Sequence, residues 1–120
     1  MHDPTMAQKI AGVLYNKKAQ DIAALDVGRL TVITDFMVIA SGRSALQVKA
    51  LAEEVEQQLA QQGAYVTRRE GHQEGRWIVL DFNSVLVHIF HQEDRAFYNL
   101  ERLWEDGSNR LVLPFNQDEE

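Results

Sequence analysis

Two strand-like runs separated by only two residues constrain the fold of this 120-residue chain more than any other feature. Residues 76–82 and 85–91 are rich in Val, Ile, Leu, Phe and Trp, and only Asn83 and Ser84 stand between them. A connection of two residues is the length of a tight β-hairpin turn. The turn then sets the register and predicts one apolar face, formed by the pairs Ile78 and Ile89, Leu80 and Val87, and Phe82 and Val85.

The other face of the predicted hairpin is mixed in character. It carries the pairs Trp77 and Phe90, Val79 and His88, and Asp81 and Leu86. Such asymmetry is typical of a sheet that has one face packed under helices and the other only partly covered. Trp77 is therefore a candidate for an exposed binding surface. The alternative is that another helix covers this face and that Trp77 is an ordinary core aromatic.

The segments before the hairpin alternate between helical and strand-like patterns. A first helix is predicted over residues 4–19, followed by a short strand at 22–27 and an apolar strand at 36–40. Ser44 and Gln47 have the spacing of a capping box, so a second helix begins there and ends near Gly63. Because a strand at 64–69 follows at once, we expect a parallel crossover from 36–40. The predicted class is α/β, with a single domain whose mixed sheet of about five strands is flanked by helices.

The chain after the hairpin is predicted to be helical and then irregular. Residues 93–104 indicate one or two short helices that carry Phe97, Tyr98, Leu103 and Trp104, most of them core residues. Gly107 and Ser108 interrupt this pattern. We therefore divide the chain into a domain at 1–106 and a C-terminal tail at 107–120, whose role is open.

Composition narrows the class of partner. The chain has no cysteine, no apolar run near the ~20 residues of a membrane span, and no signal-like N-terminus, so we expect a cytoplasmic protein that contacts no membrane. Its net charge of −6 argues against a protein that binds mainly phosphates, so little direct nucleic-acid contact is expected. A basic protein partner fits this charge better, although mild acidity also simply favours solubility.

Three groups of residues were weighed as catalytic or metal sites. His88 and His91 form an H-x-x-H pattern, but on a strand this spacing places the side chains on opposite faces, so a shared metal is not expected. Asp81 stands without a second carboxylate beside it in the sequence, and one carboxylate cannot hold the two metal ions of a nucleotidyl transfer. Ser44, which follows Gly42 and Arg43, is explained as a helix cap. We expect no catalytic residue, no metal and no cofactor, and keep a nucleotidyltransferase-like enzyme as the minority alternative.

Four segments together resemble one known family. They are TDFMVIASGRS at 34–44, GRWIVLD at 75–81, VHIF at 87–90 and FYNLERLW at 97–104, and their order and spacing match as well. The chain resembles the ribosomal silencing factors, the iojap-related family, over about residues 10–106. It departs from the family at Phe36-Met37, where Tyr-Phe is frequent, and at Phe82-Asn83-Ser84, where Tyr-Gly-Asp is common. These changes keep size or turn character, and the tail shows no family pattern.

The resemblance implies a function as well as a fold. Members have an α/β fold similar to that of nucleotidyltransferases, bind large-subunit ribosomal protein fourteen, and block association with the small subunit, which represses translation without catalysis. Carried over to this chain, the resemblance and the mixed hairpin face imply a partner-binding surface made of Trp77, Asp81, His88, Tyr98, Asn99, Leu100, Glu101 and Trp104. A self-associating module is the other alternative, and a homodimer is compatible with ribosome binding.

Overall fold

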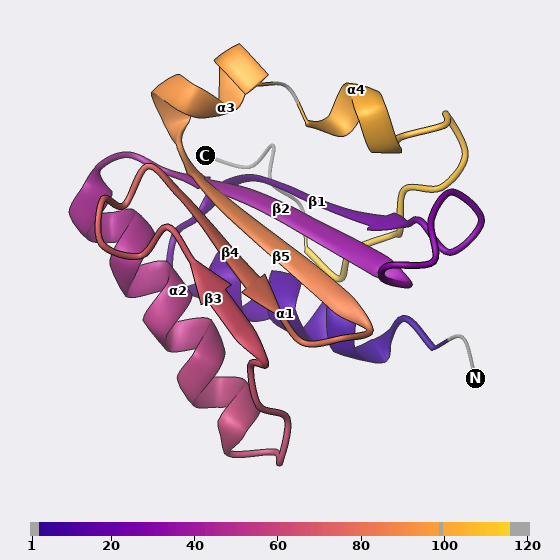
Figure 1. Cartoon of the computed structure of the whole chain (residues 1–120), viewed down its shortest axis with the longest axis horizontal. Coiled ribbons are helices and arrows are strands. Elements are labelled where there is room, and N and C mark those ends of the chain that lie inside the picture. Colours follow the sequence, from indigo (N-terminus) through magenta and orange to yellow (C-terminus); the bar gives the residue numbers. More distant parts are fainter. Residues whose placement is uncertain (1–2, 99, 116–120) are drawn as a thin grey trace.

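Across residues 3–98 and 100–115, which the computed structural model describes, the chain forms a five-stranded mixed sheet with helices on both faces (Figure 1). The strand order is β1-β2-β5-β4-β3. Strands β2 and β5 are parallel, and the other neighbouring pairs are antiparallel. The predicted α/β class with a mixed sheet of about five strands is confirmed. The strands are β1 (Gln20–Asp26), β2 (Phe36–Gly42), β3 (Arg68–Glu70), β4 (Trp77–Asp81) and β5 (Val85–His91).

The hairpin of β4 and β5 has the predicted register. Ile78 stands opposite Ile89 and Leu80 opposite Val87, and the Phe82 N–H donates to the Val85 carbonyl at 2.9 Å. Asn83 adopts a positive φ of 73°, a conformation that Asn tolerates better than most residues. The two-residue turn therefore closes the hairpin and places the aliphatic pairs of Ile78 with Ile89 and Leu80 with Val87 on one face.

Two long helices cover that apolar face. Helix α1 (Thr5–Asn16) and helix α2 (Ala45–Ala60) lie on the same side of the sheet (Figure 1). The predicted helix cap at Ser44 is confirmed, because the Gln47 N–H donates to Ser44 Oγ at 3.1 Å. The Gln47 side chain accepts from the N–H of Arg43, one residue before the cap, rather than from that of Ser44. The main core lies between these helices and the sheet. Its largest fully buried side chains include Ile10, Leu14, Leu51, Leu59, Ile78, Leu80 and Ile89.

The prediction for the third strand was partly wrong. The strand occupies Arg68–Glu70 rather than 64–69, and it pairs antiparallel with β4 at the sheet edge rather than lying next to β2. Its three residues are exposed and carry no apolar face that a central position would bury. The strand that pairs with β2 is β5, because both strands are apolar on both faces, as interior strands should be. β3 still runs in the same direction as β2, as expected, although β5 and β4 lie between them in the sheet.

The second face of the sheet has a thinner cover. Two short helices lie over it, α3 (Gln92–Tyr98) and α4 (Glu101–Trp104), as the sequence predicted (Figure 1). A smaller apolar cluster forms beneath them, made of Leu25, Val27, Met37, Ile39 and Phe90. Trp77, Leu86, Leu100 and Trp104 pack against this cluster and are only partly buried.

The segment after α4 returns to the edge of the sheet. The Asp26 N–H donates to the Asn109 carbonyl and the Leu111 N–H to the Ala24 carbonyl, both at 2.8 Å, so this segment pairs with the outer edge of β1. Further on, the ring of Phe115 stacks on Tyr15 with centroids 4.2 Å apart. Because an unpaired edge strand is a template for aggregation, this pairing protects β1.

Candidate partner-binding surface

The structure gathers most of the predicted site residues on the thinly covered face. Trp77 and Asp81 lie on β4, His88 lies on β5, Leu100 immediately precedes α4, and Glu101 and Trp104 lie on α4. Strand alternation puts Trp77, Asp81 and His88 on the side of the smaller cluster. Asn99 and the side chain of Tyr98 lie outside the described residues, so their predicted roles stay predictions.

The indole of Trp77 is half-buried and held in place by two contacts. Its Nε1–H donates to His88 Nδ1 at 3.1 Å. Its ring stacks on Phe90 with centroids 4.8 Å apart and an interplanar angle of 26°. A partly exposed aromatic ring fixed in this way has little rotamer freedom left to lose when a partner covers it.

His88 is a buried residue that holds the indole of Trp77 by a hydrogen bond. Its side chain is 6% exposed, and burial lowers its pKa to about 4, so the imidazole is neutral near pH 7. Because Nδ1 accepts the indole proton, the imidazole hydrogen is on Nε2, which has no hydrogen-bond partner among the described residues. His88 is therefore both packed within the chain and hydrogen-bonded to the indole.

The other titratable groups that sequence analysis weighed have local structural roles. Asp81 Oδ1 accepts the Asn83 N–H at 2.8 Å and so supports the hairpin turn. His91 Nδ1 accepts the Glu93 N–H at 3.2 Å, at the start of α3. Within residues 3–98 and 100–115, no group of three or more His, Cys, Asp or Glu side chains could hold a metal ion.

An ion pair joins the two short helices. The buried guanidinium of Arg95 on α3 donates through Nε and Nη2 to the two carboxylate oxygens of Glu101, at 3.1 and 2.6 Å. Nη1 of the same residue donates to the buried Ser41 on β2 at 2.8 Å. Burial raises the pKa of Glu101, but the hydrogen bonds and charge of Arg95 outweigh it, so the pKa is lowered overall and the carboxylate is ionised. Sequence analysis missed Arg95 and Ser41. The separations of Arg95 from Glu101 and from Ser41 do not match the contact spacing of a single helix or strand.

Exposed apolar side chains extend this face at one end. Leu103 on α4 is 73% exposed, and Val32 and Ile33 in the loop between β1 and β2 are 103% and 73% exposed. The Asn109 side-chain amide ties the two regions together by donating to the carbonyls of Asp26 and Trp104 at 2.9 and 2.8 Å. Residues 28–34 lie between the strands predicted at 22–27 and 36–40, and the adjacent apolar pair Val32-Ile33 within them was the signal available in the sequence.

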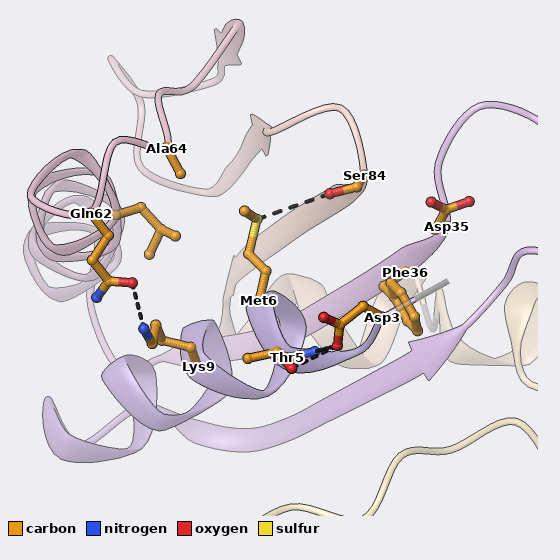
Figure 2. Close-up of a pocket in the computed structure, with 10 residues that line it drawn as sticks. Asp3, Thr5, Met6, Lys9, Asp35, Phe36, Gln62, Ala64 and Ser84 are labelled. Carbon is orange, nitrogen blue, oxygen red and sulfur yellow. Dashed lines mark hydrogen bonds between the residues drawn. The ribbon is translucent and has the colours of Figure 1, made fainter. Parts of the chain in front are cut away.

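A hollow on the other side of the sheet contains none of the predicted site residues (Figure 2). It lies between the start of α1, the end of α2 and the β4–β5 turn, and Met6, Phe36 and Leu59 supply its apolar lining. Its polar groups bond within the chain, as when Lys9 Nζ donates to Gln62 Oε1 and Thr5 donates to Asp3 (Figure 2). This region has no arrangement of groups that suggests catalysis.

Fold and surface together define an α/β domain with one face sealed by long helices and the other presenting fixed, half-covered aromatics, a class suited to protein binding. Comparison with known proteins identifies the family. Residues 1–120 match the family described as "Ribosomal silencing factor during starvation", and the chain belongs to this family. The resemblance seen in the sequence is confirmed. The family name describes a regulatory factor.

Curated relatives and solved structures agree with this assignment. The chain is 38% identical to ribosomal silencing factor of Bacillus subtilis over 107 residues, which are 89% of this chain and 91% of that protein. It is 33% identical to the chloroplastic protein Iojap of Zea mays, over 93% of this chain and 48% of that protein. A crystal structure from Bacillus halodurans superposes with a TM-score of 0.81 at 34% identity, covering 92% of this chain and all of that one. A second, from Chromobacterium violaceum, has a TM-score of 0.81 at 31% identity, covering 96% and 94%.

Proposed function

We propose that this chain binds the large ribosomal subunit through its ribosomal protein fourteen and sterically blocks the small subunit, repressing translation in the cytoplasm. The observation that carries the proposal is the fixed, partly buried indole of Trp77 on the thinly covered face, in a chain that belongs to the ribosomal silencing factors. Aromatic anchors of this kind dominate the energetics of many protein interfaces.

The proposed surface has an apolar centre and an acidic surrounding. Trp77, Leu100 and Trp104 supply the apolar contacts, and His88 keeps the indole oriented. Asp81 adds negative charge, whereas the charge of Glu101 is already paired with Arg95. Tyr98 and Asn99 belong to the surface by family resemblance, and the chain as a whole has a net charge of −6. A protein partner from the ribosome is basic, so opposite charge speeds encounter and favours correct orientation.

The proposed mechanism needs no reaction. A molecule bound at the subunit interface occupies space that the small subunit requires, so one copy per ribosome is sufficient. The chain is therefore proposed to be a binding protein and not an enzyme. In support, the Asp81 carboxylate already bonds to the hairpin turn, and the described residues contain no cluster that could hold catalytic metal ions.

Self-association is proposed as a second property of the same surface. Leu103, Val32 and Ile33 are large, exposed apolar side chains at one end of it, and a second copy would shield them from water. A homodimer and the ribosome-bound form would then exclude each other. Light scattering of the free protein at several concentrations measures this: a concentration-dependent doubling of mass supports it, and a constant monomer mass contradicts it.

Sedimentation with purified subunits tests the main function. We expect the protein to co-sediment with free large subunits, but neither with small subunits nor, in quantity, with joined ribosomes. It should also lower the yield of joined ribosomes when both subunits are mixed. Tyr65→Ala serves as a control, because Tyr65 is an exposed aromatic outside the proposed surface, so its truncation should leave binding unchanged. Equal recovery in all three fractions would contradict the steric mechanism.

A further inference from the structure

Arg95 joins three elements of the thinly covered face. It lies on α3, and its guanidinium bonds to Ser41 on β2 and to both oxygens of Glu101 at the start of α4. The side chain of Arg95 is 10% exposed and that of Glu101 is 20% exposed, so water competes poorly for the pair. A bidentate pair of this kind also fixes the orientation of both groups.

The pair encloses the segment that family resemblance connects with partner binding. Residues 96–100 lie between its two members, and Leu100 packs against the smaller apolar cluster at the end of this segment. Because Arg95 is also bonded to Ser41 on β2, the pair ties the start of α4 to the sheet. Breaking one member of a buried ion pair is strongly unfavourable because the other charge is left without a partner.

We propose that Arg95 is a positioning residue for partner binding, and that Glu101 acts through Arg95 rather than by touching the partner. Both Glu101 oxygens accept hydrogen bonds from Arg95, so the charge of this carboxylate is already neutralised within the chain. The pair keeps Leu100 and Trp104 in a binding-competent arrangement. The predicted loss of partner binding rests on the proposed function, but the predicted change in the packing of α4 does not.

The structural consequence can be tested without a ribosome. The chain has two tryptophans, so in a Trp77→Phe background the emission reports Trp104 alone. Arg95→Met should shift that emission to longer wavelength, because α4 loses its bond to Arg95 and Trp104 becomes more exposed to water. Arg110→Met is the matched control: Arg110 makes a bidentate pair with Glu105 next to the same helix, but that pair is more exposed. Equal emission from the Arg95→Met and control variants would overturn the proposal.

A double-mutant cycle tests the binding consequence. Arg95→Met and Glu101→Gln should each weaken large-subunit binding, about tenfold if the competent arrangement falls to roughly a tenth of the population. The double variant should bind no more weakly than the weaker single variant, because both remove one interaction. Arg95→Lys, which keeps the charge but not the two-pronged geometry, should fall in between.

The competing explanation predicts a different pattern. If Glu101 contacts a cation of the partner directly, the two losses multiply to about a hundredfold and Glu101→Gln reduces the salt dependence of the association rate. That result would overturn the positioning role. A failure of the unsubstituted protein to bind large subunits would instead refute the proposed function, and the Trp104 emission would still decide whether the Arg95–Glu101 pair positions α4.

Discussion

Truncation of Trp77 to alanine should separate binding from folding. A fully buried aromatic truncated to alanine typically costs ~3–5 kcal/mol of stability, and Trp77 is only half-buried, so we expect a loss of about 2 kcal/mol. Its stacking on Phe90 and its hydrogen bond to His88 together account for a loss of that size, at roughly 1 kcal/mol each. At about 4 °C per kcal/mol for a domain of this size, the melting temperature falls by about 8 °C and the protein stays folded at 25 °C.

The same change should also weaken binding while the protein stays folded. Loss of an interface anchor costs about 2 kcal/mol or more of binding free energy, which raises the dissociation constant roughly thirtyfold. Ile89→Ala is the comparison, because Ile89 is fully buried on the opposite face and should lose ~3–4 kcal/mol of stability with little direct effect on binding while folded. The assays are urea unfolding and large-subunit co-sedimentation at 25 °C.

Two results would refute this reasoning. If folded Trp77→Ala binds within threefold of the unsubstituted protein, the indole is not an anchor. If it unfolds as readily as Ile89→Ala, the face is more firmly covered than the partly buried Trp77 indicates. Trp77→Phe refines the test, because it keeps a ring stacked on Phe90 but removes the N–H that bonds to His88.

Two further predictions concern His88 and the C-terminal segment. The folded pKa of His88 is about 4 and the ordinary value is 6.5, so the unfolded chain binds the extra proton between these values, and stability is full above pH 6.5 and falls as pH drops towards 4. We expect a loss of about 2 kcal/mol from this group between pH 8 and pH 5, measured as the difference in urea unfolding between the unsubstituted protein and His88→Asn; equal slopes for the two proteins would contradict it. Truncation after Asp106 removes the segment that pairs with β1 and packs Leu111, Leu113 and Phe115 on the core, so it should lower the melting temperature and promote aggregation, seen as rising light scatter. An unchanged melting temperature would show that this pairing contributes little.

Features set by neighbouring residues were predictable from the sequence. The hairpin register followed from a two-residue turn and an alternating pattern, because one residue of slippage would place apolar side chains in water. The capping contacts of Ser44 and Gln47 followed in the same way from a spacing of three residues. Partial cover of the second face was one of two alternatives that the sequence left open, since the mixed pairs around Trp77 and His88 fit a face that is not fully buried.

Features that depend on distant parts of the chain were not predictable. The third strand is a polar edge strand, and its partner is decided by which other strands compete for the central places. The return of residues 109–111 to β1 depends on backbone groups, which leave no mark in the side-chain pattern. The pair of Arg95 and Glu101 spans two helices and a turn, so neither helical nor strand spacing indicates it.

The parallel pairing of β2 and β5 has a consequence for how the chain acquires its structure. These two strands form the centre of the sheet, yet helix α2 and strands β3 and β4 lie between them in the sequence. The hairpin of β4 and β5 needs only a local turn and can close within microseconds, whereas joining it to β2 requires closing a long loop first. We therefore infer that docking of the finished hairpin onto β2 limits the folding rate. During synthesis on the ribosome, the centre of the sheet would remain open until β5 had left the exit tunnel.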